Sequence, residues 1–438
     1  MQLNIDGGAV RIIERLEMAK FETYVVGETV RDLMMNVCPH EFDIVTSAAP
    51  EQVKLLFQRT VNYNPQNGTI NVIIDGTSYK VSSFERLPDK SYNKKTDFSK
   101  FDFTINSMAY SHVRGLCDYF GGAEDLKNKI IRCVGNSEEK FKNEPICMLI
   151  AVRFAVVFGF DIEENTKKAM KKCAPLVRKI KAEAVREELD RILMSDNPER
   201  IVLMHELGLL KYIIPELDIC FGEPQRNKYH IYDVGMHIMK ALENLPEDLT
   251  VRWAVLLHDI GKPNCSSTDA NGVIHFYGHH KESQKIANDV LHRLHFDSET
   301  IQNISVLVEN HDVRIDASVP SVKRMMAKVG EELFEKLMTV QEADSRAKNP
   351  IYIDEKLARI NSVRSIFKKV LAEHQPYSVN GLAVTNRDLM KLGFKTGREV
   401  ADVLRILLED VIVTPEYNNR DYLLKKAKLL RRKKGFGR

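Results

Sequence analysis

The stretch VRWAVLLHDIGKPN, residues 251–264, combines the end of a helix with a group of polar side chains. Its first half is apolar at helical spacing and predicts a buried helix, which the Gly-Lys-Pro sequence ends. His258 and Asp259 are adjacent there, and Lys262 follows three residues later. An imidazole and a carboxylate in one place suit a divalent ion, and a nearby ammonium group suits a phosphate.

A single histidine–aspartate pair is more often a salt-bridged helix end than a metal site. The surrounding sequence favours the metal site, because nine of the thirteen histidines lie between His230 and His311. This concentration of one residue type predicts a functional site in this part of the chain.

Length and composition predict a soluble globular protein with several domains. The chain has 438 residues, and a single hydrophobic core rarely serves more than about 250–300 residues. The net charge of +3 does not by itself indicate nucleic-acid binding. The seven cysteines contain no CxxC motif, which favours reduced thiols in the cytoplasm. We expect no signal peptide and no membrane span, because no apolar run approaches roughly 18 residues.

The first hundred residues alternate between helical and extended patterns. Residues 41–45 alternate with period two, so Glu41 and Asp43 are expected on one face of a strand. Further strands are expected at residues 69–74 and 78–84. Two carboxylates on one face can hold metal ions for nucleotidyl transfer. A solvated strand face is the alternative explanation for such a pair.

Four longer stretches carry a resemblance to a known family. YVVGETVRDLMMNVCPHEFDIVTSAAPEQV (24–53), FDFTINSMAY (101–110), DYFGGAEDLKNKIIRCVGN (118–136) and AVRFAVVFGFDIEENT (151–166) resemble the bacterial CCA-adding tRNA nucleotidyltransferases and poly(A) polymerases. These proteins have a polymerase-β-like head. The resemblance implies a small mixed α/β head (1–140), an all-α neck (141–220), an HD body (221–350) and a helical RNA-binding tail (351–438).

The same resemblance assigns residues of the head to roles. It implies catalytic and metal-binding carboxylates at Glu41 and Asp43, which would hold Mg²⁺, with CTP and ATP as substrates. It implies a nucleotide-binding set made of Gly27, Arg31, Asp32, Asp102, Asn106 and Arg153. Residues 142–159 are expected to form one continuous neck helix.

The head departs from the family pattern where that chemistry takes place. Glu28 replaces the second glycine of a Gly-Gly pair, and Glu41 replaces an aspartate. Lys80 stands where a third carboxylate is usual, Phe101 where an arginine is usual, and Cys147 lies in a neck helix that usually carries acidic and arginine side chains. A lysine beside a metal site opposes the ion by several kcal/mol at a dielectric of about 20. The sequence therefore predicts a folded head with impaired nucleotidyl transfer.

The histidine-rich region resembles the HD-domain metal-dependent phosphohydrolases. The resemblance implies a metal-ligand set of His237, His258, Asp259 and Asp344. It also implies that His279 and His311 flank the phosphate or a second ion, that Lys262 pairs with phosphate oxygen, and that these three are catalytic. Asp312 is expected to orient a partner, and the remaining histidines of the region are interpreted as surface or half-buried residues: His230, His275, His280, His292 and His295. The ion could be Mn, Fe, Co, Ni or Zn, and a structural or vestigial cluster is the alternative.

The C-terminal part has its own signature. SVNGLAVTNRDLMKLGFKTGREVADVLRILLEDVIV (378–413) resembles the tRNA-binding tail of the same family, and residues 420–438 hold nine Lys or Arg against one Asp. A basic end on a near-neutral chain suits phosphate-backbone contact. No protein partner is inferred.

Three hypotheses follow from the sequence. The main one is a tRNA-acting protein whose working site is an HD phosphatase or cyclic phosphodiesterase. The alternatives are a functional CTP/ATP-dependent CCA-adding enzyme and a tRNA-binding protein without catalysis.

Overall fold

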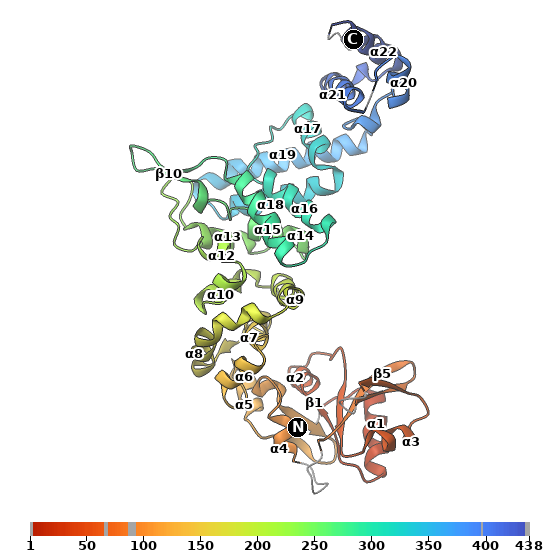
Figure 1. Cartoon of the computed structure of the whole chain (residues 1–438), viewed down its shortest axis with the longest axis vertical. Coiled ribbons are helices and arrows are strands. Elements are labelled where there is room, and N and C mark those ends of the chain that lie inside the picture. The colour runs from red at the N-terminus through yellow and green to blue at the C-terminus, as the bar shows by residue number, and fades with distance from the viewer. Residues whose placement is uncertain (1–2, 65–68, 86–92, 396, 434–438) are drawn as a thin grey trace. The chain divides into compact units, whose positions relative to one another are not determined.

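The computed structural model describes residues 3–64, 69–85, 93–395 and 397–433. The chain divides into two compact units, the first made of Met1–Ile192 with Leu203–Ile213 and the second of Leu193–Val202 with Ile214–Arg438. Figure 1 shows the strands gathered near the N-terminus and helices through the rest of the chain. The predicted fold class, a mixed α/β head followed by helical parts, is confirmed. The finer division into four domains stays a prediction.

The first unit contains a seven-stranded mixed sheet with the order β3-β4-β5-β2-β1-β6-β7. Only β2 and β5 pair in parallel, and the other neighbours in this sheet are antiparallel. The strands are β1 (Thr23–Val26), β2 (Asp43–Thr46), β3 (Thr60–Asn64), β4 (Thr69–Ile74), β5 (Thr77–Ser83), β6 (Met108–Ser111) and β7 (Gly115–Asp118). The predicted strands at 69–74 and 78–84 match β4 and β5 to within one residue.

The strand predicted from residue 41 begins two residues later, at Asp43. The reason is a side chain of the neighbouring helix α2 (Glu28–Met34). The hydroxyl of Thr29 donates to the Glu41 carbonyl and accepts from the Asp43 N–H, at 3.1 Å each. These backbone groups are thus satisfied by Thr29, so Glu41 precedes the strand.

Short helices cover the sheet and complete the head. Helices α1 (Gly7–Met18) and α3 (Pro50–Leu56) pack against each other (Figure 1). Helix α1 also contacts β1 and β2, and α3 contacts β4. The apolar side of α1 is fully buried, with Ile12 and Leu16 at its centre. The other head elements are α4 (Lys94–Phe98), α5 (Gly122–Lys127) and the short pair β8 (Ile130–Ile131) and β9 (Asp161–Ile162).

The neck of the first unit is helical but not continuous. The single helix predicted over 142–159 is wrong: α6 (Ser137–Asn143) ends, and α7 (Cys147–Val157) begins anew. Pro145 lies between them, and a proline disfavours helical geometry in the residue before it. Helices α8 (Glu164–Cys173), α9 (Ala182–Leu193), α10 (Val202–Glu206) and α11 (Leu210–Ile213) follow, and α12 (Pro215–Asp218) already belongs to the second unit.

The second unit contains a helical bundle. Trp253, with no exposed surface, lies in its core and packs edge-on against Phe296 at 5.2 Å between ring centroids. A small hairpin, β10 (Ser266–Thr268) and β11 (Ile274–Phe276), projects from the bundle (Figure 1). The helices are α13 (Val234–Leu242), α14 (Leu249–Leu257), α15 (His279–Arg293), α16 (Ser298–Asn310), α17 (Val319–Val329), α18 (Glu331–Arg346) and α19 (Ile353–Ala372).

The tail of the second unit has a separate apolar core built on α21 (Gly397–Val413), with Leu404 and Leu407 among its buried residues. Helices α20 (Asn386–Lys391) and α22 (Arg420–Lys433) pack on it. Arg420 donates to Asp388, which ties α22 to α20. Residues 434–438 of the predicted basic end lie outside the described residues.

The sequence predicts no membrane span and favours reduced thiols. Among the described helices, none combines the length and apolarity that crossing a bilayer demands. All seven cysteines are free thiols.

Candidate functional site

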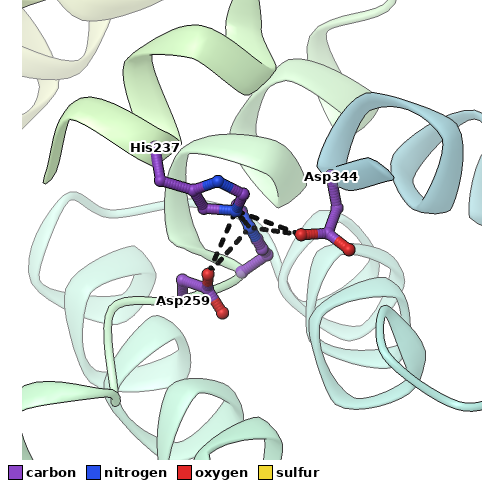
Figure 2. Close-up of side chains that lie close together, drawn as sticks. His237, Asp259 and Asp344 are labelled. Carbon is purple, nitrogen blue, oxygen red and sulfur yellow. Dashed lines mark hydrogen bonds and ion pairs between the residues drawn. The ribbon is translucent and has the colours of Figure 1, made fainter. Parts of the chain in front are cut away.

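Four predicted metal ligands of the second unit converge at the centre of the helical bundle. Donor atoms of His237, His258, Asp259 and Asp344 all lie within 4.8 Å of one another, and all four residues are buried. Figure 2 shows the labelled side chains His237, Asp259 and Asp344 pointing toward one point. The Nε2 atom of His237 lies 3.1 Å from Asp344 and 3.4 Å from Asp259.

Local structure explains why these side chains meet. Helix α13 begins at a cap in which Asp233 accepts from the Met236 N–H, and His237 lies one turn into the helix. Helix α14 ends at His258, its C-cap residue. Gly261 follows in the next turn, and a Cβ atom at this position would lie only 2.4 Å from the Ser283 backbone nitrogen. A larger residue at 261 would therefore push α15 away from this turn.

The histidines are oriented by the backbone. The Nδ1–H groups of His258, His279 and His311 donate to carbonyl oxygens three residues earlier, at 2.6, 2.8 and 2.7 Å. Because a carbonyl oxygen only accepts, each Nδ1 carries a proton and each Nε2 is the nitrogen that faces the site. Nε2 of His279 and Nε2 of His311 both lie 3.4 Å from Asp259 Oδ1.

Asp259 lies between two groups of donors. Its Oδ2 faces His237 and His258, and its Oδ1 faces His279 and His311. Both oxygens are buried and make no hydrogen bond; their contacts are ion pairs. Such a carboxylate fits a cation, since a buried charge requires a paired charge or a metal. Two divalent ions could share Asp259, with His279 and His311 completing a second group of three donors.

Charges in the cluster are strongly coupled. Burial raises the pKa of Asp259, but His258 and Lys262 outweigh burial and hold this pKa well below its usual range. Burial lowers the pKa of His258, yet Asp259 and Asp344 raise it to about 9. For His311, burial prevails and the pKa falls. Ionised carboxylates are already in the state that metal binding requires, whereas His258 would have to release a proton on binding the ion.

Lysines surround the two carboxylates. The Nζ atom of Lys262 lies 2.6 Å from Asp259 Oδ2 and 2.7 Å from the Oε1 of Gln225. Lys348 forms an ion pair with Asp344 Oδ2, the oxygen that carries no dashed line in Figure 2. The sequence prediction of Lys262 at this site agrees with its place, whereas Gln225 and Lys348 were missed.

A pocket of about 590 Å³ opens onto this cluster. His230 lines it and packs its ring edge-on against His237 at 5.0 Å, although the sequence placed His230 outside the site. The hairpin residues His275, Phe276 and Tyr277 also line it. Asp312, predicted to orient a partner, lies 3.7 Å from His279 and 3.8 Å from His280. No sequence signal marks His230, Gln225 or Lys348, because their proximity to the cluster depends on how the chain folds around it.

The second predicted cluster lies in the head, at the start of β2. The parallel register of β2 and β5 places Asp43 opposite Lys80, and Lys80 Nζ lies 3.1 Å from the Asp43 carboxylate. The side chains of Lys80 and Asp43 are 41% and 34% exposed. Glu41 is exposed. Groups of three or more donors suited to a metal occur, among the described residues, only in the second unit.

The predicted nucleotide-binding residues of the head form a hydrogen-bonded network. The Arg31 guanidinium donates to Asp32 at 2.7 Å and to Asn106 at 2.9 Å, and Asn106 donates to Asp102 at 2.9 Å. Arg31 also lies 4.8 Å above the Phe158 ring. Burial raises the pKa of Asp102. Arg31 and Asp32 lie on α2, and Asp102 and Asn106 lie in the segment before β6. The hydrogen bonds hold these four side chains in fixed positions.

Gly27 and Arg153 are the two other residues of the predicted nucleotide-binding set. Gly27 adopts a φ of +70°, which favours glycine, and Phe101 lies 3.0 Å from where its Cβ would be. Glu28 begins α2 with a 59% exposed side chain and lies 3.4 Å from Arg31. Arg153 donates to the buried Glu188 at 2.6 Å, so its guanidinium is engaged within the neck.

The fold and the two clusters define a protein with a polymerase-type nucleotidyltransferase head and an HD body. Family models match in the same order: the poly(A) polymerase head domain at residues 23–132, the probable RNA- and SrmB-binding site of polymerase A at 159–220, and the HD domain at 228–349. The chain therefore carries the three domains that these models describe, in agreement with the resemblance to the CCA-adding enzymes seen in the sequence.

Individual relatives support this assignment to different extents. A CCA-adding enzyme of Leuconostoc mesenteroides is 35% identical over 56% of this chain, but the match spans only 61% of that relative. One of Enterococcus faecalis is 28% identical, and the match covers 97% of this chain and 96% of the relative.

Solved structures agree on the fold. The Bacillus stearothermophilus CCA-adding enzyme in complex with CTP has a TM-score of 0.71 at 22% identity, over 98% of each chain. The Thermotoga maritima CCA-adding enzyme complexed with tRNA has a TM-score of 0.58 at 20% identity, over 98% of this chain and 100% of that one.

Proposed function

We propose that the head adds nucleotides to tRNA 3′ ends, as a CTP- and ATP-dependent CCA-adding enzyme of the cytoplasm. The observation that carries the proposal is the match to the E. faecalis CCA-adding enzyme along 97% of the chain. This supports the functional alternative over the prediction that nucleotidyl transfer is impaired.

The exposure of Lys80 gives a physical reason for preferring that alternative. An ion pair between half-exposed groups contributes up to about 1 kcal/mol, because solvent screens it. The several kcal/mol expected from the sequence assumed weak screening by solvent, whereas at 41% and 34% exposure water reaches both groups and screens the pair. Lys80 can turn toward solvent when a divalent ion competes for Asp43.

Different residues of the head would then bind the metal ion, position its ligands and bind the nucleotide. Glu41 and Asp43 would hold Mg²⁺, which neutralises phosphate charge during transfer when it is bound. Thr29 fixes the backbone on both sides of residue 42 and so positions these carboxylates. The network of Arg31, Asp32, Asn106 and Asp102 would receive the nucleotide beside Gly27.

The test is addition of labelled CTP and ATP to a tRNA that lacks its CCA end, by the purified full chain with Mg²⁺. The wild type should add nucleotides, and Asp43→Asn should not. Absence of addition by the wild type, with the tRNA shown to be bound, would refute the proposal.

A second function is favoured by the buried cluster of the second unit. We propose that His237, His258, Asp259 and Asp344 hold a divalent transition metal and that the site hydrolyses phosphoesters. The buried set of two imidazoles and two carboxylates fits such an ion. When bound, the ion supplies Lewis acidity and a nucleophilic water at neutral pH.

The chain's own residues would complete this hydrolytic site. Lys262, held by Gln225, would contact phosphate oxygen, and His279 and His311 would flank the phosphate or hold a second ion. The test pairs metal analysis of the purified protein with phosphoester hydrolysis. Metal-loaded protein that leaves both monoesters and diesters intact would refute this second function.

A further inference from the structure

Two lysines lie on the two carboxylates of the cluster and face one pocket. Lys262 follows α14 and contacts Asp259 Oδ2 at 2.6 Å; Lys348 follows α18 and contacts Asp344 Oδ2. Both line the same pocket of about 590 Å³. Asp344 turns its other oxygen, Oδ1, toward His237 (Figure 2), so the two oxygens of this carboxylate contact different partners.

Lys348 is held in the pocket wall by its neighbours. The next residue, Asn349, donates its backbone N–H to the Tyr229 carbonyl at 2.8 Å and its side-chain amide to the Lys228 carbonyl at 2.9 Å. The Lys348 side chain is 14% exposed. Its ammonium group is therefore a fixed part of the site rather than a mobile surface charge.

A count of charges gives the kind of phosphate that the pocket suits. Asp259 and Asp344 carry two negative charges, and Lys262 and Lys348 compensate them. Two other charged residues of the lining, Lys228 and Asp312, cancel each other. One divalent ion would therefore leave the site with a net charge of about +2 when its histidines are neutral. A phosphomonoester carries about −1.5 to −2 at pH 7, whereas a diester carries one negative charge.

We propose that Lys348 is a specificity-determining residue that, together with Lys262, selects phosphomonoester dianions over phosphodiesters. This inference rests on the hydrolytic function proposed for the site and names its substrate class. A dianion has three terminal oxygens to share among the ion and the two ammonium groups. A diester has only two, and its second ester group would crowd the lysine that receives no oxygen.

A purely structural role for Lys348 makes a different prediction. If Lys348 only neutralised Asp344, its removal would change metal binding and the hydrolysis of both substrate classes alike. If it binds the phosphate, its removal would weaken monoester hydrolysis and phosphate binding, while Mn²⁺ binding would stay equal or become tighter because a nearby positive charge is lost.

The experiment compares full-length wild type, Lys348→Met, Lys348→Arg and the control Lys240→Met, whose lysine is paired with Glu243 on an exposed part of α13. Calorimetry measures Mn²⁺ binding and then inorganic phosphate binding to the Mn²⁺-loaded proteins. Hydrolysis of 4-nitrophenyl phosphate and bis(4-nitrophenyl) phosphate gives kcat/KM for each class.

Loss of a charge-assisted hydrogen bond predicts a fall of about 10–100-fold in monoester kcat/KM for Lys348→Met. Phosphate affinity should fall by roughly the same factor, diester kcat/KM should change less than about threefold, and Lys348→Arg should recover part of the loss. Equal losses for both classes, or unchanged phosphate affinity, would overturn the proposal. If neither ester is hydrolysed, the hydrolytic function fails, and the phosphate titration still decides the role of Lys348.

Discussion

Asp43 in the head and Asp259 in the second unit are both aspartates paired with a lysine, but their surroundings differ. The Asp43 side chain is 34% exposed, and that of Asp259 is 1% exposed. Water screens the pair of Asp43 with Lys80, so Lys80 opposes a cation only weakly. The buried pair of Asp259 with Lys262 is weakly screened, so it helps to define the charge of its site. The same two residue types therefore have different consequences, and burial decides between them.

The largest effect expected is loss of nucleotide addition in Asp43→Asn. Removing a carboxylate that would hold Mg²⁺ should lower the rate by about 1000-fold or more, since the ion neutralises phosphate charge during transfer. The measurement is incorporation of labelled CTP into tRNA lacking CCA. Asp75→Asn is the matched control, because Asp75 is an exposed head aspartate paired with Arg11. Equal activity of the wild type and Asp43→Asn would exclude Asp43 as a metal ligand.

Asp259→Asn should affect only the buried cluster of the second unit. We expect Mn²⁺ affinity to fall by more than about 100-fold, because changes even beyond the direct ligands lower affinity by about 10–100-fold. Nucleotide addition by the head should be unchanged. Binding of Mn²⁺ as in the wild type would show that the cluster is structural.

Metal removal should destabilise the second unit. An ion present at about 100 times its Kd stabilises the folded state by about 2.7 kcal/mol. Chelation should therefore lower the Tm of this unit by roughly 5–10 °C, as followed by calorimetry. A transition that is the same with and without chelator would show that no ion is bound.

The smallest effect expected is that of Lys80→Glu. Removing a half-exposed ion pair and restoring a carboxylate should raise the rate of nucleotide addition by roughly fivefold, which corresponds to about 1 kcal/mol. Lys100→Glu, at an exposed head lysine paired with Glu85, provides the control. A gain of 100-fold or more would mean that Lys80 blocks the site, as the sequence predicted.

Local sequence patterns predicted the elements that depend on local chemistry. The apolar run of residues 251–257 lies in α14, and the strand predicted at residues 69–74 is β4. The side chain of Thr29 moved the start of β2, and Pro145 divided the neck helix. Both corrections concern hydrogen bonds or steric limits that a pattern of apolar residues does not contain.

The residues of the clusters were predictable to a different degree. The histidines and aspartates of the second unit stood out through their type and order, and the structure brings them together. Gln225 and Lys348 did not stand out, because lysine and glutamine occur throughout a charged surface. The place of Lys348 in the pocket follows from packing between segments more than a hundred residues apart, such as the bond from Asn349 to Tyr229, and Gln225 reaches Lys262 across 37 residues.

The most direct test of the central claim compares the wild type with Lys80→Glu in one assay of CTP and ATP addition to tRNA lacking CCA. The claim is that Lys80 is too exposed to disable the head. It predicts addition of nucleotides by the wild type and a gain of only about fivefold in the variant. No addition by the wild type, together with clear addition by Lys80→Glu, would contradict the claim and restore the prediction of an impaired head.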